Sequence, residues 1–387
     1  MSLAQQVLDA RDREAVRVLV DRSELADLVD AVEPLAGEVV RLLRVDARKA
    51  YEVAERAELV AASSSDERSR ARSRWVKGHV LWGVSRIPEA LEAYRAAERA
   101  YRSLGAPDEA LRIAIGQVNA LAWLGRYREA MELGEKTRKA LVRAKQPDAV
   151  ARLDLNLGNV HHWSGRPREA LARYDRALRF ARSRNDPAMT RMVQMNRGTQ
   201  LSALGRLEAA EKVFRDVREG ASESGERRNA AVADYNLGYI LFQRGDYGAA
   251  YDTLDAARVA FEELGDDLYL TGTLIDLAEL LIEVNESRRA FRLAEEARER
   301  AERQGLRFER GRAALLQGVA SLGNGASAEA RDLLEHALAA FREEGRTSLG
   351  AMCDVYLAEI DRRAGEAGSA DRRLRRALAV FRAEGMK

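Results

Sequence analysis

Side chains suited to binding recur along this 387-residue chain at intervals of forty residues. Arginine offers a planar fork of donors that fits a carboxylate, and asparagine offers both a donor and an acceptor to any extended backbone. Tryptophan supplies a rigid apolar plate. Members of these series are Arg72, Arg112 and Arg152, then Asn156, Asn196 and Asn236, and also Trp123 and Trp163. They predict recognition of an extended, acidic ligand if the fold brings them to one surface.

Catalytic chemistry has less support. The four histidines include the adjacent pair His161 and His162, which point to different faces of a helix and do not form the i, i+4 pair of a metal site. Cys353 lies where a side chain is expected to pack, which predicts a buried thiol. We therefore expect no enzyme, no cofactor and no metal. A metal or hydrolytic enzyme built on His161 and His162 is the alternative.

The elements that position these residues must be helical. The chain is 46% hydrophobic and 33% charged, and only 6 Pro and 28 Gly interrupt it. One cysteine excludes an internal disulfide. No apolar run approaches the roughly 18 residues that span a bilayer, and the first residues do not resemble a secretory signal. We expect a cytoplasmic, all-helical protein without a membrane partner.

Sliding the sequence against itself by forty residues aligns it without a gap. A turn residue lies five residues before each register alanine, and glycine returns fifteen residues after six of them, so each period holds two helix ends. Two ends per period predict two helices of about 15–18 residues. The register alanines are Ala90, Ala130, Ala170, Ala210, Ala250, Ala290, Ala330 and Ala370, and Ala50 fits more weakly; the turn residues before them include Ser85, Gly125, Gly165, Gly205, Gly245, Asn285, Gly325 and Gly365.

Small residues also recur in the middle of the predicted helices. Glycine there costs about 1 kcal/mol, so its recurrence predicts close contact between two backbones. Large apolar residues four positions after the register alanine are expected to fill the space opposite, and examples are Tyr94, Tyr174, Leu254 and Leu334 opposite Gly78, Gly158, Gly238 and Gly318. Each period is therefore an antiparallel helical hairpin that must stack on its neighbours.

This pattern resembles the tetratricopeptide repeat. The resemblance implies an all-α fold, a right-handed α-solenoid of stacked antiparallel helical hairpins, with eight repeats of forty residues over 63–387 and capping helices with a degenerate repeat over 1–62. The forty-residue spacing and the string Asn-Leu-Gly are similar to long-helix members found in kinesin light chains, in bacterial quorum-peptide response regulators and beside CHAT protease domains.

The two ends of the array are expected to differ. Residues 1–24 predict one covering helix, and Ser63-Ser64-Ser65-Asp66-Glu67 predicts a helix start. At the far end, the turn Gly385-Met386-Lys387 leaves Leu374, Val380 and Phe381 near an uncovered stacking face. Three explanations remain open, namely a longer protein with an effector domain, self-association through the last repeat, or a last helix that is polar enough.

The resemblance also places the groove-facing positions 18, 14, 11, 8 and 7 residues before the register alanine. The candidate peptide-binding residues on this concave face are Arg72, His79, Trp82, Arg112, Asn119, Trp123, Arg152, Asn156, Asn159, His162, Trp163, Asn196, Asn236 and Tyr239. Two other interpretations compete. The asparagines could bond to one another between repeats, and Trp123 and Trp163 could fill the hairpin turns.

Charge favours an acidic partner. Residues 61–220 hold 31 Lys and Arg against 19 Asp and Glu, between two segments of net negative charge. No run of five basic residues exists and no DNA-binding module is visible, so nucleic acid is disfavoured. We expect a scaffold or sensor that binds an acidic or extended peptide or a protein partner. The alternative is the regulatory region of a larger effector, such as a CHAT-type protease or a transcriptional regulator.

Overall fold

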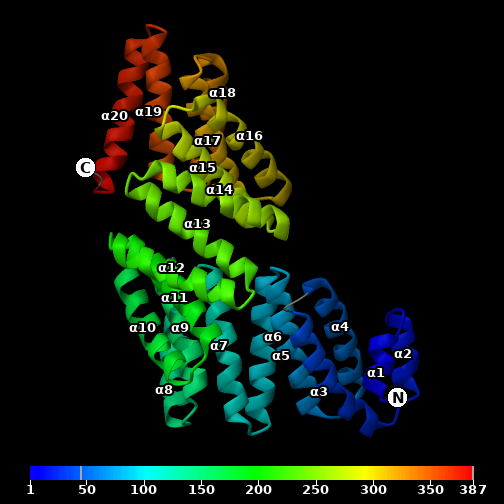
Figure 1. Ribbon diagram of the computed structural model, residues 1–387. Helices are drawn as coiled ribbons and strands as arrows, with labels where there is room; N and C mark the ends of the chain where they lie inside the picture. Colours follow the sequence, from blue (N-terminus) through cyan, green and yellow to red (C-terminus); the bar gives the residue numbers. More distant parts are fainter. Residues whose placement is uncertain (44–45, 386–387) are drawn as a thin grey trace. The chain divides into compact units, whose positions relative to one another are not determined.

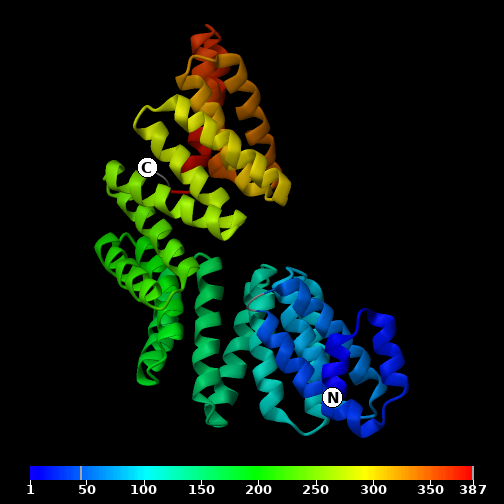
Figure 2. The same cartoon turned by 45° about the vertical axis from the view of Figure 1, so that its right-hand side comes forward.

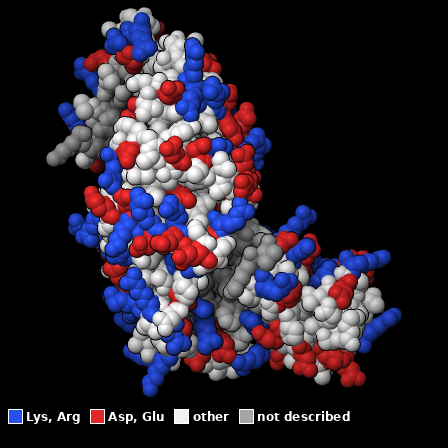
Figure 3. Space-filling model, viewed as in Figure 1, with Lys and Arg blue, Asp and Glu red and all other residues white. Residues whose placement is uncertain are grey.

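The computed structural model describes residues 1–43 and 46–385, and these ranges contain twenty α-helices and no strand. Within each of the two compact units of the chain, most consecutive helices run antiparallel and pack side by side (Figures 1 and 2). None of the helices in the described ranges has the length and hydropathy to span a bilayer. Basic and acidic side chains are interspersed over the face of the molecule in view (Figure 3).

Helix bounds follow the forty-residue period. Each hairpin has a first helix and a second helix of 17 or 18 residues. The hairpins are α5 (Glu67–Gly83) with α6 (Ile87–Ser103), α7 (Pro107–Trp123) with α8 (Tyr127–Arg143), α9 (Pro147–Trp163) with α10 (Pro167–Ser183), α11 (Pro187–Ala203) then α12 (Leu207–Glu223), α13 (Arg227–Gln243) with α14 (Tyr247–Leu264), α15 (Asp267–Glu283) with α16 (Ser287–Gln304), α17 (Arg307–Gly323) with α18 (Ser327–Glu343), and α19 (Thr347–Arg363) with α20 (Ala367–Ala383).

The predicted turn residues end the helices in the left-handed conformation. Gly125 has φ 74°, and Ser85 and Asn285 both have φ 60° although they carry side chains. Lys145 and Asn185, with φ 52° and 51°, occupy the same conformation at positions where other repeats have glycine. Left-handed backbone is strained for most side chains, so the turn at Lys145 is held by the stacking around it.

The small mid-helix residues meet the large residues predicted to face them. A Cβ added at Gly78 would lie 2.5 Å from the ring of Tyr94, and one added at Gly238 would lie 2.7 Å from Leu254. Gly158 faces Tyr174 in the same way. The glycines therefore mark contacts in which a ring or a branched side chain lies directly on the backbone of the partner helix.

One prediction for the N-terminal segment is wrong. Residues 1–24 form two short helices, α1 (Leu3–Asp9) and α2 (Arg13–Asp21), rather than one. The break follows from Asp12, whose side chain accepts a hydrogen bond from the backbone of Ala15 and so starts a new helix. They cover α3 (Leu25–Leu42) and α4 (Ala47–Ser63), with which they share an apolar core.

Other features of the two ends agree with expectation. Asp66 caps α5 by accepting a hydrogen bond from the backbone of Ser69, as the predicted helix start requires. Pro34 lies inside α3. On α20, Leu374 is 48% exposed, while Val380 and Phe381 are half-buried. Met386 and Lys387 of the predicted last turn lie outside the described residues.

The chain forms two compact units, Met1–Leu204 and Gly205–Lys387. In unit 1, the first helices α5, α7, α9 and α11 contact one another in sequence, and in unit 2 α13, α15, α17 and α19 do the same. Each unit is therefore an all-α solenoid of stacked antiparallel hairpins in which the first helices form one wall. The expected division into a cap and an eight-repeat array describes sequence segments and stays a prediction.

Candidate functional site

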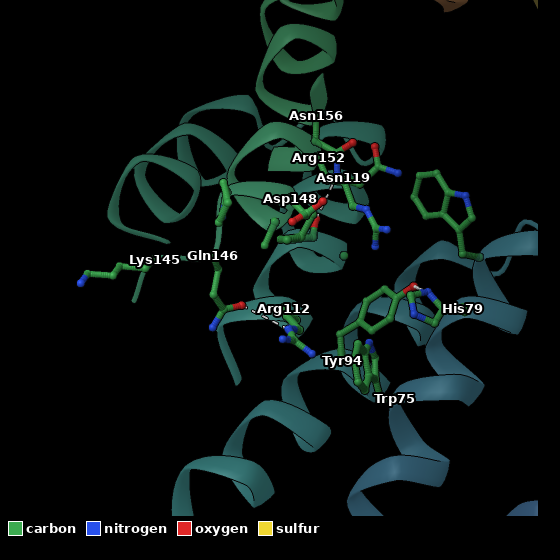
Figure 4. Close-up of a pocket in the computed structure, with 15 residues that line it drawn as sticks. Trp75, His79, Tyr94, Arg112, Asn119, Lys145, Gln146, Asp148, Arg152 and Asn156 are labelled. Carbon is green, nitrogen blue, oxygen red and sulfur yellow. Dashed lines mark hydrogen bonds between the residues drawn. The ribbon is translucent and has the colours of Figure 1, made fainter. Parts of the chain in front are cut away.

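A cavity of about 770 Å³ opens on the wall of first helices in unit 1. It is lined by α5, α7 and α9, by one residue of α6 and by the turn that precedes α9 (Figure 4). Six of the predicted groove residues line it, namely His79, Trp82, Arg112, Asn119, Arg152 and Asn156. Residues from three consecutive repeats thus meet because adjacent first helices pack directly on one another.

Aromatic rings form one side of the cavity. The Tyr94 hydroxyl and His79 Nδ1 are hydrogen-bonded at 3.0 Å (Figure 4), and the rings of Trp75 and His79 lie 5.9 Å apart. Burial, with the charge of Arg72, lowers the pKa of His79 to about 4, so the imidazole is neutral at pH 7. The tyrosine ring is held between the backbones of Gly78 and Gly116. This side is therefore rigid, apolar and uncharged.

Two guanidinium groups supply positive charge. The side chains of Arg112 and Arg152 extend toward the middle of the cavity, whereas Lys145 points away from it (Figure 4). Arg112 donates to Gln146 Oε1 at 3.2 Å. Among the described residues neither arginine forms an ion pair, and the carboxylate of Asp148, also in the lining, lies 3.8 Å from Arg184, the residue that follows α10. Both guanidinium groups can therefore donate hydrogen bonds to a carboxylate of a ligand.

Two amide atoms of the cavity lack partners. Asn119 Oδ1 and Gln146 Nε2 are buried and make no hydrogen bond within the described part of the chain. Buried polar atoms are almost always satisfied, and an unmet bond costs about 1–3 kcal/mol. One atom is an acceptor and the other is a donor, which are the groups that a ligand's backbone N–H and C=O require.

The other predicted residues of unit 1 are already engaged. Arg72 binds Glu33 of α3 through two hydrogen bonds of 2.8 Å. Asn159 Oδ1 accepts hydrogen bonds from the Tyr174 hydroxyl at 2.7 Å and from Asn196 Nδ2 at 3.2 Å. The asparagine ladder between repeats therefore exists at this pair, although Asn119 does not take part in it.

Asn156 and His162 also have protein partners. Asn156 Nδ2 donates to the backbone carbonyl of Ile115 on α7 at 3.3 Å. His162 Nδ1 lies 3.0 Å from the side-chain nitrogen of Gln200 on α11. Both contacts join one first helix to the next, so these residues hold the wall together beside the cavity.

Trp123 and Trp163 differ in burial, since Trp163 is partly buried against the apolar core of unit 1. Trp123 is 59% exposed. Its ring lies between those of Trp82 and Trp163, at 5.9 and 5.3 Å, in near-perpendicular contacts. Of the three, only Trp82 lines the cavity.

The two candidates of unit 2 lie in a different environment. Asn236 Nδ2 donates to the carbonyl of Val232 in its own helix at 2.7 Å, and Tyr239 is 37% exposed. Nearby, the buried carboxylate of Asp276 accepts from the Tyr235 hydroxyl at 2.6 Å and from Arg312 at 3.1 Å. The structure therefore does not bring Asn236 and Tyr239 into the cavity of unit 1.

The sequence reasoning missed nine of the fifteen lining residues, among them Trp75, Tyr94, Lys145 and Gln146. The position of Tyr94 was recognised only as a packing position, because its ring fills the space opposite Gly78. Lys145 gave a signal that could have been used, since it stands where other repeats have glycine, although the turn before α9 keeps the left-handed conformation. Gln146 follows Lys145 directly, and its contact with Arg112 could be recognised only from the structure.

The candidates for catalysis are poorly placed. Cys353 is buried, which raises the pKa of its thiol to about 12 and so disfavours the reactive thiolate. Burial also lowers the pKa of His161. No group of three or more His, Cys, Asp or Glu side chains in the described ranges could hold a metal ion.

Residues 149–223 match the family model of the tetratricopeptide repeat. This segment of the chain therefore consists of tetratricopeptide repeats. The matched segment covers most of α9 and all of α10 to α12, and helices with the same forty-residue spacing lie on both sides of it in the sequence. No curated protein sequence matches the chain significantly.

Solved structures of other repeat proteins share this fold. The apo form of the quorum sensor NprR from B. thuringiensis is 17% identical over 91% of this chain and 99% of its own, with a TM-score of 0.70. The Rap conjugation gene regulator of plasmid pLS20, solved in complex with the Phr* peptide, is 16% identical over 91% and 95%, at 0.59. Aspartyl phosphate phosphatase F from Bacillus subtilis is 11% identical over 90% and 94%, at 0.58. At these identities the likeness establishes the fold.

Proposed function

We propose that this protein is a peptide-binding scaffold or sensor whose unit 1 cavity holds an extended segment with an acidic side chain. The observation that carries the proposal is the conjunction of two guanidinium groups that form no ion pair with a described residue, those of Arg112 and Arg152, with two buried amide atoms that lack partners, on Asn119 and Gln146. A carboxylate would bind the first pair, and a peptide backbone would bind the second.

The chain itself supplies an example of the proposed contact. Arg72 occupies the position equivalent to Arg112 and Arg152 in the preceding repeat, and Glu33 binds it with both oxygens. Arg312 occupies the same position in unit 2 and binds Asp276 and Glu279. At both of these repeat positions the arginine is bound by carboxylates of the chain. This supports an acidic ligand at the two open positions, Arg112 and Arg152.

The comparisons support the class of ligand. One structural relative is called a quorum sensor, and another was solved with a bound peptide. We propose for this chain a role in binding rather than in catalysis, in the cytoplasm of a bacterial cell. A protein segment with the same chemistry would bind as well as a free peptide.

We further propose that the last repeat can self-associate. Leu374 and Leu378 on α20 are 48% and 47% exposed, and they lie one turn apart on the same side of the helix. Replacing both leucines with glutamate should lower the molar mass measured by light scattering if two copies join through this face. An unchanged mass would remove this part of the proposal.

The test of peptide binding is a selection from a display library of random dodecapeptides, followed by fluorescence anisotropy with the selected peptides. We expect enrichment of Asp and Glu, and a loss of at least 100-fold in affinity for Arg112→Glu with Arg152→Glu, because reversal of two charges replaces attraction with repulsion (about 3 kcal/mol or more). Arg128→Glu with Arg168→Glu is the matched control, since both side chains are exposed on second helices outside the cavity. Equal affinities for the two double variants would refute the proposal.

A further inference from the structure

Three of the four tryptophans form a continuous ridge in unit 1. Trp82, Trp123 and Trp163 lie at or next to the ends of α5, α7 and α9, and we call them the tryptophan ridge. Their successive ring centroids are 5.9 and 5.3 Å apart, and the ring planes meet at 68° and 82°. Such edge-to-face contacts fix the rings relative to one another, so the ridge is preorganised.

The ridge is open to a ligand. Trp123, its middle member, is 59% exposed, although it has an aromatic neighbour on both sides. None of the three indole N–H groups donates a hydrogen bond to another described residue, and none is buried without a partner. Trp82 also lines the cavity, so the ridge begins where the cavity ends.

The charges beside the ridge are largely neutralised. Each of these tryptophans is followed in the chain by an arginine of the hairpin turn. Arg86 is 3.1 Å from Glu89 and also donates to the Tyr51 hydroxyl, and Arg126 is bound to Glu129. Only Arg166 has no such partner among the described residues. The ridge therefore favours an uncharged apolar segment over a phosphate backbone.

We propose that the tryptophan ridge binds a proline-rich segment in the polyproline II conformation. The inference rests on the proposed function and deepens it, because the segment would continue from the acidic anchor in the cavity. It assigns to the ligand a composition, acidic residues followed or preceded by prolines.

Three physical properties favour this occupant. Polyproline II is already extended, so it loses little conformational entropy on binding to aromatic surfaces. It has no internal hydrogen bonds, so its carbonyl groups can accept from the free indole N–H groups. It rises about 3.1 Å per residue, so four residues in succession cover the length of the ridge.

The test uses the small number of tryptophans in the chain. The intact protein, labelled with ¹⁵N, should show four indole N–H signals, one each for Trp75 and the three ridge residues. We expect decaproline amide to shift the three ridge signals in a saturable way and to leave Trp75 unchanged. A decamer of alternating Gly and Ser should shift none.

Two variants of exposed residues complete the experiment. Trp123→Ala should weaken decaproline binding by about 10-fold or more, as loss of a central aromatic anchor does. Val142→Ala, on α8 and 53% exposed, should bind like the parent protein. The inference is overturned if the ridge signals do not shift, if Trp123→Ala binds equally well, or if decathymidylate shifts them as strongly as decaproline, which would reassign the ridge to nucleic acid.

Failure of this inference can be told from failure of the proposed function. The double variant Arg112→Glu with Arg152→Glu should lose the selected acidic peptides and keep the decaproline shifts. If acidic peptides bind through the two arginines and decaproline does not bind, only the ridge inference fails. If the reversal leaves acidic peptides bound while decaproline still binds the ridge, the acidic site fails.

Discussion

Glu33 and Arg72 form a two-pronged ion pair in which both N–O distances are 2.8 Å, and the guanidinium group also lies 5.1 Å from the ring of Trp75. The pair joins the degenerate repeat to the first full one. It occupies an arginine position that is open in the next two repeats. A carboxylate of the chain thus stands where a ligand's carboxylate could otherwise bind.

Glu33→Gln should therefore extend the acidic site by one position. Peptides with two acidic residues should bind the variant several-fold more tightly than the parent, since the guanidinium group of Arg72 becomes available in addition to those of Arg112 and Arg152. The free energy of unfolding should change by less than about 1 kcal/mol, because the Glu33 side chain is 71% exposed. Isothermal titration with singly and doubly acidic peptides measures the effect. No preference for the doubly acidic peptide in the variant would contradict it.

Gly158→Ala should destabilise unit 1. The added methyl group would meet the ring of Tyr174 at a distance that forces one of them to move, and overpacking of this kind costs about 1–3 kcal/mol. Gly37→Ala is the control, since Gly37 lies inside α3 with nothing within 4 Å of the added atom. That change should stabilise its helix by up to about 1 kcal/mol. Thermal unfolding followed by circular dichroism should show shifts of opposite sign.

Ser85→Gly should raise stability. Ser85 has φ 60°, a conformation that glycine adopts without the penalty of a side chain. The gain should be about 0.5–1 kcal/mol in a denaturant titration. Gly125→Ala, at φ 74° in the next repeat, should lose a similar amount. If both variants shift the midpoint in the same direction, the left-handed turns are not the cause.

The free energy of unfolding should decrease as the pH falls from 6.5 to 4, and His79 should be responsible for part of this pH dependence. Burial holds the pKa of the folded imidazole at about 4, against 6.5 for the exposed group. In this pH interval the imidazole is therefore protonated in the unfolded chain and neutral in the folded chain. This difference lowers the free energy of unfolding by at most about 1.4 kcal/mol for each unit by which the pH falls. The contribution is fully present above pH 6.5 and is lost as pH falls toward 4.

His79→Gln removes the titrating imidazole, so this difference in proton binding between the folded and unfolded chains disappears. The variant should show a shallower loss of stability between pH 6.5 and 4 in urea titrations at several pH values. His336→Gln is the matched control, because that histidine is exposed on α18. A slope that is unchanged in His79→Gln would show that the folded imidazole is protonated like a free one.

The repeat unit could be predicted from the sequence because its signals are local. Gly125 and its counterparts fall where the backbone turns left-handed, and Gly158 falls where Tyr174 lies on the helix. These features lie within one hairpin, and the forty-residue spacing repeats them along the chain. The break between α1 and α2 escaped prediction because it depends on one cap, that of Asp12, without a repeat to support it.

The candidate site could be predicted only in part. Arg112, Arg152 and Asn119 were found because the repeat places them on the wall of first helices. That Arg72 is bound by Glu33 could not be foreseen, since the partner comes from a repeat with few of the family's signals. Nor does a sequence reveal which amide atoms remain unsatisfied, because this depends on the distances between helices.

The uniform forty-residue spacing of the hairpins has a consequence for how such a protein can change. Because the hairpins recur every forty residues and a hairpin of such an array contacts mainly its neighbours, a whole hairpin could be removed or duplicated while most contacts of the others remain. The span of the binding wall would then grow or shrink in steps of one helix width. Recognition of longer or shorter partners would be reached by copying a segment of DNA, with no new contact to invent.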